Sequence, residues 1–141
     1  DVSEAHASIR ERLADRFGSE AAARFGVPES TLRYYEKKGL LPLLERDEAG
    51  RRSFSEFHMI LLKVVMHLKH THMPLESIRQ YVNWVVEGDS TTQQRLEMML
   101  KHRQNVLDEI ATMHEALDGI DVKIATYEER VRKKTFQEAA Q

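Results

Sequence analysis

Hydrophobic residues recur along most of the chain at the three- and four-residue spacing of a helix, and the alternation typical of strands is nearly absent. The clearest case is 56–72, where the apolar positions line one face of a helix. Glycine (6 residues) and proline (3 residues) are scarce, and most of them fall between the periodic stretches. The pattern therefore predicts a mostly α protein. The core-facing positions of 56–72 are Phe57, Leu61, Val64, Val65 and Leu68.

Two short helices joined by a tight turn are expected between Ser19 and Gly39. Serine is a good N-cap, so Ser19 is expected to begin the first helix, and Gly26 suits the left-handed conformation that follows its end. Pro28 is tolerated near the start of the second helix because the first amides of a helix lack partners, and Gly39 ends that helix. Such a pair is a helix-turn-helix. Its small core is predicted to contain Ala22, Leu32 and Tyr35.

A two-stranded wing is expected within 41–56, where two short segments flank a polar turn that ends at Gly50. Ser55 is placed to cap the helix that follows. Phe54 before it and Met59 after it occupy the two positions of a hydrophobic staple. The wing and the two short helices together predict a winged helix-turn-helix.

Two further helices are expected in the second half of the chain. One begins near Pro74 and ends at Gly88, and the other continues without proline from about Ser90 to Val131, a length of about 60 Å. The second carries a coiled-coil heptad pattern, in which only one a or d position is not apolar. Such a seam needs a partner, and a second copy of the same chain is the simplest one. The a positions are Leu96, Arg103, Ile110, Leu117, Ile124 and Val131, and the d positions are Met99, Val106, Met113, Ile120 and Tyr127.

These elements divide the chain into four segments. Apolar residues at four-residue spacing predict an N-terminal helical extension over 1–17, which we interpret as a docking arm. The winged helix-turn-helix with two accessory helices is expected over 18–88. The dimerisation helix follows over 89–132, and a short tail over 133–141.

Composition excludes several classes of function. The net charge is −2, so any affinity for nucleic acid must come from a local patch. Cysteine is absent, which excludes disulfides, thiolate metal sites and thiol redox switches. No apolar run reaches the roughly 20 residues of a membrane span, and the first residues lack the apolar stretch of a signal peptide. We therefore expect a cytoplasmic protein.

A local basic patch is expected on the second short helix and on the wing. Arginine can form forked hydrogen bonds with guanine or phosphate. Tyrosine can contact phosphate through its hydroxyl while its ring packs against a neighbouring helix. A solvated basic helix face is the alternative for the helix alone, and the arginines of the wing favour DNA binding. The candidate DNA-binding residues are Thr31, Arg33, Tyr34, Tyr35, Lys37, Lys38, Arg46, Arg51 and Arg52.

Three stretches, EAAARFGVPESTLRYYEKKGLLP, GRRSF and MPLESIRQY, precede the long helix. Together they resemble the MerR family of transcriptional regulators, over about residues 18 to 130. The resemblance implies a homodimer held by an antiparallel coiled coil. It also implies that the winged domains bind a palindromic promoter element and distort the DNA so that RNA polymerase can use it. By position, it assigns recognition-helix contacts to Thr31, Arg33, Tyr34 and Tyr35 and wing contacts to Arg51 and Arg52.

The chain departs from that family at three positions. The family's wing usually has the pattern GYR.Y, whereas Arg51 and Phe54 occupy its two aromatic positions here, and Pro28 stands where a capping serine is common. We expect the short branch of the family, in which no separate effector domain follows the coiled coil. Because cysteine is absent, sensing by a thiol or by a soft metal is excluded.

A bound effector is left open by the sequence. One hypothesis is a small apolar ligand near Tyr81, Trp84 and Met98, and the other is that these side chains only pack the fourth helix against the coiled coil. His67 and His70 share a helix face, but no carboxylate or cysteine completes a set, so no metal and no other cofactor is expected.

An enzyme is not expected, because the chain has no Gly-rich phosphate loop, nucleophile elbow or metal-binding helix motif. The alternative to a DNA-binding regulator is a dimeric structural or adaptor protein that uses the same seam without binding DNA. An affinity for DNA that falls steeply as salt rises distinguishes the first from the second.

Overall fold

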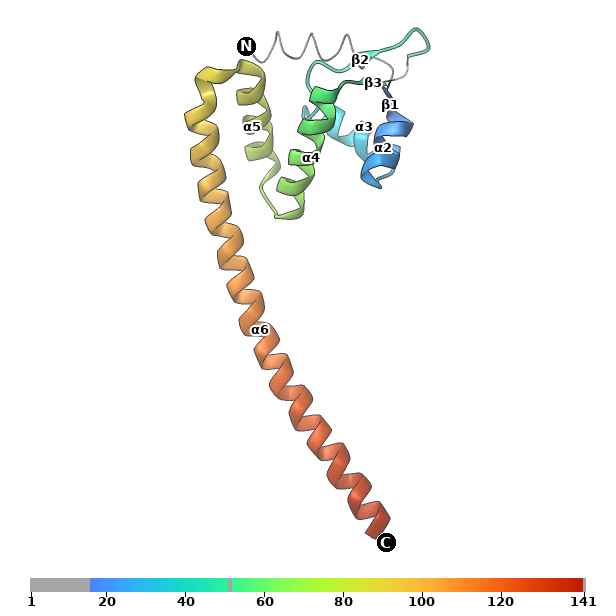
Figure 1. The fold of residues 1–141 in the computed structure, drawn as a ribbon, viewed down its shortest axis with the longest axis vertical. Helices are drawn as coiled ribbons and strands as arrows, with labels where there is room; N and C mark the ends of the chain where they lie inside the picture. Colours follow the sequence, from blue (N-terminus) through green and yellow to red (C-terminus); the bar gives the residue numbers. More distant parts are fainter. Residues whose placement is uncertain (1–15, 51, 141) are drawn as a thin grey trace. The chain divides into compact units, whose positions relative to one another are not determined.

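The computed structural model describes residues 16–50 and 52–140, and the chain divides between Leu100 and Lys101 into two compact units. In the described residues, the first unit contains a small sheet, four α-helices and one 3-10 helix before the start of a long helix (Figure 1). The mostly α prediction is confirmed. The elements are β1 (Arg16–Phe17), α2 (Gly18–Phe25), α3 (Glu29–Lys37), β2 (Glu45–Arg46), β3 (Arg52–Phe54), α4 (Glu56–His70), α5 (Leu75–Glu87), the 3-10 helix η1 (Asp89–Thr91) and α6 (Thr92–Ala140).

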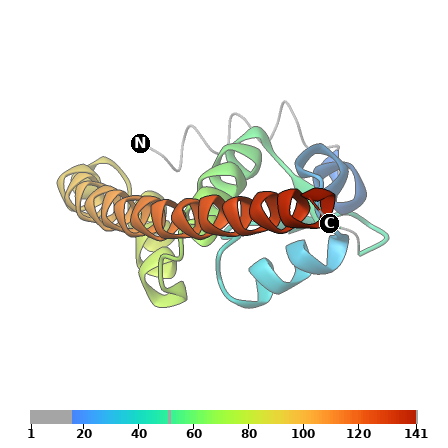
Figure 2. The same cartoon turned by 90° about the horizontal axis from the view of Figure 1, so that it is seen from below.

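Helices α2 and α3 form the predicted helix-turn-helix and lie against one side of α4 (Figure 2). Gly26 ends α2 with a φ of 65°, and the amides of Gly26 and Val27 donate to the carbonyls of Ala23 and Ala22. This is a Schellman motif, which satisfies the last carbonyls of the helix. The prediction that Ser19 is the N-cap is wrong. The chain passes directly from β1 into α2, so Gly18 is already helical.

Gly39 terminates α3 in the same way. Its φ is 77°, its amide donates to Glu36 O at 3.0 Å, and the amide of Leu40 donates to Tyr35 O at 2.9 Å. At the other end Pro28 occupies the N-cap and makes no side-chain cap bond, as expected for a residue without a polar side chain. Helix α3 therefore begins and ends at the proline and glycine that the sequence predicted.

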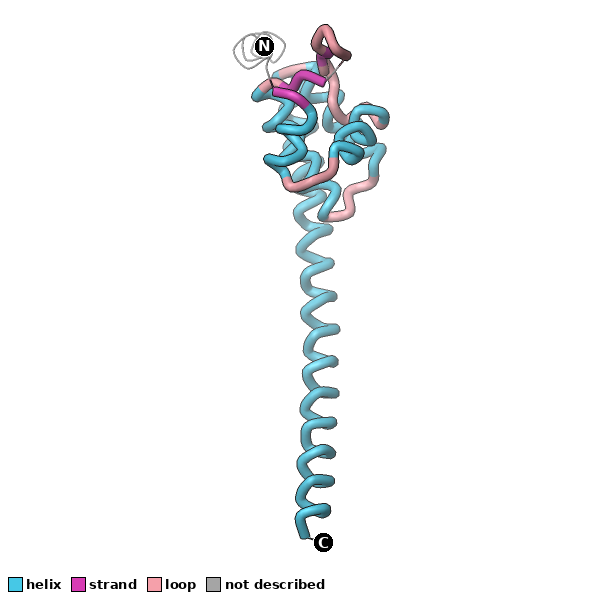
Figure 3. The backbone as a smooth tube through the Cα atoms, turned by 90° about the vertical axis from the view of Figure 1, so that its right-hand side faces the viewer, coloured by secondary structure: helices cyan, strands magenta, loops and turns pink. Residues whose placement is uncertain are grey.

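The wing is present, but its sheet has three strands rather than two. Strand β3 lies between β1 and β2 and pairs antiparallel with both, with Arg46 opposite Arg52 and Arg16 opposite Phe54 (Figure 3). Of the N-terminal extension, residues 1–15 lie outside the described residues. The helix expected through residues 16 and 17 is a strand instead. Pairing with β1 satisfies backbone groups that an unpaired edge of β3 would leave open.

Ser55 caps α4 as predicted, and it does so reciprocally with His58. The Ser55 hydroxyl accepts from the His58 amide at 3.3 Å, and His58 Nδ1 accepts from the Ser55 amide at 3.3 Å. His58 Nε2 lies 2.7 Å from Pro42 O, to which it can donate a hydrogen bond. The fully buried imidazole thus links the end of the wing, the start of α4 and the loop after α3.

The core of the first unit lies between α2, α3, α4 and α5. It contains the three helix-turn-helix residues that the sequence indicated, and both members of the predicted staple, Phe54 and Met59, are buried in it. Thr91 joins this core to the start of α6, because its hydroxyl donates to Trp84 O at 2.6 Å and to Gly88 O at 2.7 Å. The buried apolar residues are Ala21, Ala22, Leu32, Tyr35, Leu40, Leu41, Phe54, Met59, Leu61, Leu62, Val65, Leu68, Met73, Ile78 and Val82.

Helix α6 has 49 residues and is longer than the sequence analysis predicted. The separate tail expected over 133–141 is wrong as far as residue 140, because this stretch continues the helix. Residues 133–140 contain no glycine or proline, and their lysine, glutamine, glutamate and alanine residues favour a helix. Of the predicted seam residues, Met99 packs against the core, whereas most of the others are exposed, Met113 at 71%. Across the described residues, we find no helix with the length and apolar character needed to cross a membrane.

Candidate nucleic-acid interface

The two faces of α3 differ sharply in burial. Leu32 and Tyr35 are buried in the core, which leaves Arg33, Tyr34 and Lys37 on the solvent side. Leu32 and Tyr35 are three residues apart and so lie on one side of the helix, while Arg33, Tyr34 and Lys37 are exposed on the rest of its surface. An element of this kind offers base- and phosphate-binding side chains on a surface that the core holds in place.

The tyrosine pair has one member in the core and one at the surface. Tyr35 is 7% exposed and Tyr34 is 43% exposed, with their ring centroids 6.0 Å apart. Burial, followed by the neighbouring Tyr34, raises the pKa of Tyr35 above its ordinary value of 10.0. Lys38 Nζ lies 5.8 Å from the centroid of the Tyr34 ring, a cation–π contact that orients both side chains on the exposed face.

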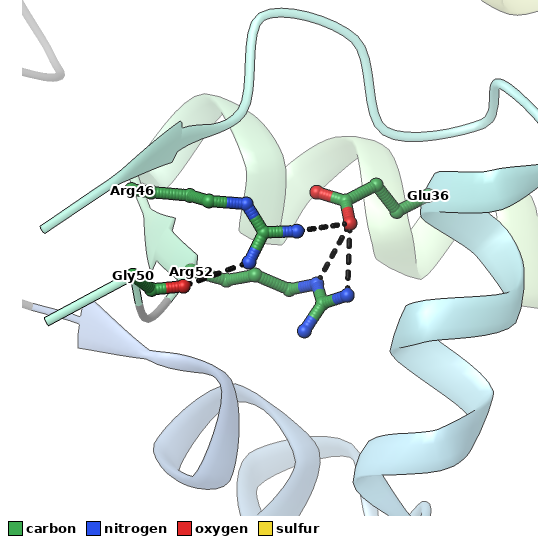
Figure 4. Close-up of polar contacts among 4 residues, drawn as sticks. All are labelled: Glu36, Arg46, Gly50 and Arg52. Atoms are coloured by element: carbon green, nitrogen blue, oxygen red, sulfur yellow. Dashed lines mark hydrogen bonds and ion pairs between the residues drawn. The ribbon is translucent and has the colours of Figure 1, made fainter.

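One carboxylate oxygen on α3, Oε1 of Glu36, contacts two arginines of the wing (Figure 4). Arg46 Nη2 donates to it at 2.9 Å, Arg52 Nε donates to it at 2.9 Å, and Arg52 Nη2 lies at 2.9 Å as well. Arg46 also donates through Nη1 to Gly50 O at 2.8 Å, across the turn of the hairpin. Arg46 and Arg52 are therefore both held toward α3.

Sequence reasoning missed Glu36, although it selected Arg46 and Arg52, which bind to it. The signal was present, because an acidic residue stands directly after the tyrosine pair on the helix that precedes a hairpin rich in arginine. Two guanidinium groups around one carboxylate leave the trio with a net positive charge. Arg52 has 19% of its side chain exposed and Arg46 has 47%, so Arg46 is the more accessible of the two. Arg51 lies outside the described residues.

The C-terminus of α3 is held from its other side by α5. Arg79 Nε donates to Lys38 O at 2.9 Å, and Arg79 Nη1 forms an ion pair with Glu76 Oε1 at 2.6 Å. The carbonyl end of a helix carries partial negative charge, so a guanidinium there is electrostatically favourable. Sequence reasoning did not select Arg79 because it stands 41 residues from Lys38.

The three residues considered for an effector pocket, Tyr81, Trp84 and Met98, are all partly exposed. Tyr81 and Met98 are partly buried and pack against the core. Burial raises the pKa of Tyr81 above 10.0, and nearby Arg95 opposes this in part. A cavity of about 570 Å³ lies elsewhere, between α2 and α4. The effector site near Tyr81, Trp84 and Met98 stays a prediction. The cavity is lined by Arg24, Phe25, Glu56, Met59, Ile60, Lys63, Met66, His67 and His70.

Comparison with known proteins identifies the family. Residues 18–83 match the family described as MerR HTH family regulatory protein. An uncharacterized HTH-type transcriptional regulator of Haemophilus influenzae is 36% identical over 78% of this chain and 82% of its own length. The chain belongs to the MerR family. It is therefore a DNA-binding transcriptional regulator and not an enzyme, as the motifs indicated.

Solved structures of MerR-family proteins agree with this assignment. HiNmlR, a MerR family regulator lacking the sensor domain and bound to promoter DNA, has 34% identity and a TM-score of 0.73 over 80% of this chain and 90% of its own. A MerR family regulator from Bacillus thuringiensis has 38% identity and a TM-score of 0.74 over 79% of this chain and 97% of its own. The fold prediction, a winged helix-turn-helix with a long C-terminal helix, is confirmed.

Proposed function

We propose that this MerR-family protein binds a palindromic promoter element as a homodimer and distorts the DNA to control transcription. The observation that carries the proposal is the exposed face of α3, where Arg33, Tyr34 and Lys37 stand beside a wing whose arginines are oriented by Glu36. The related HiNmlR is bound to promoter DNA, which supports the same kind of partner here. The proposed DNA contacts are those of Thr31, Arg33, Tyr34, Tyr35, Lys37, Lys38, Arg46, Arg51 and Arg52.

The exposed seam of α6 supports the homodimer. Leu117, Ile120 and Ile124 are 49%, 56% and 49% exposed in the single chain. A continuous apolar surface exposed to water is unfavourable and usually marks an interaction site. An antiparallel coiled coil with a second copy would cover them, and would place one winged domain near each end of the pair. Tyr35 is only 7% exposed, so its contact with DNA would be small beside that of Tyr34.

A rigid dimer supplies a physical route to DNA distortion. Two recognition helices held at a fixed separation can both enter the major groove only if their half-sites have the matching spacing and phase. Where the promoter differs from that geometry, the DNA must bend or twist, at a cost of about 1–6 kcal/mol that the protein contacts offset. RNA polymerase would then act on the altered promoter as an indirect partner. The location that suits this activity is the cytoplasm.

The experiment that tests DNA recognition compares the wild-type protein with Arg33→Ala on a duplex selected from a random pool. Fluorescence anisotropy over a range of salt concentrations is the measurement. We expect Arg33→Ala to lose about 1–3 kcal/mol of binding free energy on the selected duplex, if Arg33 contacts a base. Arg132→Ala is the matched control, because it removes the same charge from α6 at a side chain that is 74% exposed. Equal affinities for all three proteins would contradict the proposed site.

A further inference from the structure

The recognition helix α3 is fixed at its C-terminal end by a residue of α5, outside the helix-turn-helix pair and the wing. Arg79, on α5, donates through Nε to Lys38 O at 2.9 Å. Its Nη1 is held by Glu76 at 2.6 Å, so the guanidinium has a defined orientation. A charge-assisted hydrogen bond to the last carbonyls of a helix is stronger than a neutral one and also complements the helix dipole.

Gly39 allows this approach. A Cβ at position 39 would lie 3.6 Å from Arg79 Nε and 4.0 Å from its Cδ, so the guanidinium stem passes directly over the glycine. The left-handed turn at Gly39 leaves the carbonyl of Lys38 accessible to α5 rather than to a further helical turn. Arg79 therefore supplies the hydrogen-bond donor to Lys38 O that a backbone amide would supply if α3 were longer.

Helix α5 is in turn fastened to the first turn of α6. Thr91 donates through its hydroxyl to Trp84 O near the end of α5, and Arg95 Nε donates to that hydroxyl at 3.1 Å. Arg95 Nη2 also donates to Gly88 O at 3.1 Å. One turn further along α6, the seam residue Met99 packs against the core. Polar contacts thus connect the end of the recognition helix, through α5, to the beginning of the seam.

We propose that Arg79 is a positioning residue that fixes the recognition helix relative to the dimer seam and so sets the half-site spacing that the regulator accepts. This inference rests on the proposed dimer and palindromic site. Arg79 is not among the proposed DNA contacts, so replacing it should not change the affinity for a single half-site. Its effect on affinity should be seen only when two recognition helices bind one duplex at the same time.

The test uses the full chain and a selected palindromic duplex in three forms: unchanged, with one base pair added at the centre, and with one half-site scrambled. Arg79→Met removes both donors but keeps a stem over Gly39, and Arg79→Lys keeps one charged donor. Glu87→Gln is the matched control, since it removes an exposed charge from the same helix without touching Arg79 or its partners. Thermal unfolding of each variant is measured alongside.

We expect Arg79→Met to bind the unchanged duplex about tenfold more weakly than wild type, the loss of one charge-assisted hydrogen bond. We further expect it to discriminate less against the added base pair and to keep its affinity for the half-site. Arg79→Lys should restore much of the discrimination, and Glu87→Gln should match wild type. If Arg79→Met discriminates against the added base pair as well as wild type does, this inference is wrong but the proposed function stands. The same holds if Arg79→Met loses equal affinity for the full site and for the half-site. A wild-type protein indifferent to spacing overturns the proposed dimeric recognition, and this inference with it.

Discussion

Arg52 on the wing and Glu36 on the recognition helix are joined through two nitrogens of one guanidinium, Nε and Nη2, both 2.9 Å from the same carboxylate oxygen. Because Arg52 is 19% exposed and Glu36 is 25% exposed, solvent screens this pair less than an ordinary surface ion pair. The hairpin therefore has a defined orientation against α3 before DNA arrives. Preorganisation of this kind reduces the entropy that binding would otherwise cost.

Replacing Glu36 by Gln should lower the specificity of DNA binding while raising non-specific affinity. The change removes a negative charge beside the proposed phosphate-binding groups, which raises the affinity for every DNA duplex. It also removes the ionic contact that orients the wing, so the selected sequence loses its advantage over other sequences. We expect the gap between a selected and a scrambled duplex to narrow by on the order of 1 kcal/mol. Competition binding at fixed salt measures it. The control is Glu29→Gln, which removes an exposed charge from the first turn of the same helix.

An unchanged gap in Glu36→Gln would show that the wing does not depend on this carboxylate for its orientation. A narrowing of equal size in Glu29→Gln would assign the effect to net charge instead. Either outcome contradicts the structural interpretation, in which the Glu36 carboxylate contacts Arg46 and Arg52.

Charge placed in the seam should separate the dimer, and charge placed off the seam should not. Leu117→Asp puts a carboxylate at an a position, whereas Val122→Asp puts one at a side chain that is 66% exposed and lies outside the a and d positions. Sedimentation velocity at micromolar concentration should find Leu117→Asp monomeric and Val122→Asp dimeric like wild type. If both variants sediment like wild type, the contact between copies lies elsewhere.

The buried Tyr35 and the partly buried Tyr81 predict a loss of stability in alkali. Burial raises the pKa of Tyr35 and of Tyr81 above 10.0, so the unfolded chain loses these protons at a lower pH than the folded one. Their contribution is fully present below about pH 10, the unfolded value, and is lost as pH rises through the folded values. Urea unfolding between neutral and alkaline pH measures it. Tyr35→Phe and Tyr81→Phe should each flatten the decline, and Tyr127→Phe, with its side chain 54% exposed, should leave it unchanged.

Two glycines should respond to alanine with opposite signs. Gly39 has a φ of 77°, and alanine there costs about 1–2 kcal/mol in the left-handed region. Space is not the cause, since the nearest atom to an added Cβ is at ordinary contact distance, 3.6 Å. Gly119 lies inside α6 with nothing within 4 Å of an added Cβ, so alanine there should stabilise the helix by about 1 kcal/mol. Urea denaturation of both variants checks the signs, and a stabilising Gly39→Ala would contradict the assigned turn.

Much of the first unit follows from local patterns in the sequence. The spacing of Leu32 and Tyr35, the breakers Gly26 and Gly39, and the cap at Ser55 each act within one turn of chain, so they could be recognised without knowledge of the fold. The heptad pattern predicted the long helix for the same reason.

The features that sequence reasoning missed depend on residues far apart in the chain. Strand β1 has two residues, too few for an alternating pattern, and it forms because β3 offers a free edge. The link between Glu36 and Arg52 spans 16 residues and that between Arg79 and Lys38 spans 41, so neither has a local signature. The helix beyond Val131 was missed because the apolar seam ends there while helix propensity continues.

Hydroxyl-radical footprinting of the wild-type protein on a selected duplex tests the central claim most directly. Two copies that present α3 and the wing to one duplex should protect two equivalent segments related by two-fold symmetry, with centres separated by a whole number of helical turns of about 10.5 base pairs. Arg33→Ala should weaken both segments together. A single protected segment, or protection spread evenly along the duplex, would contradict dimeric recognition of a palindrome by this surface.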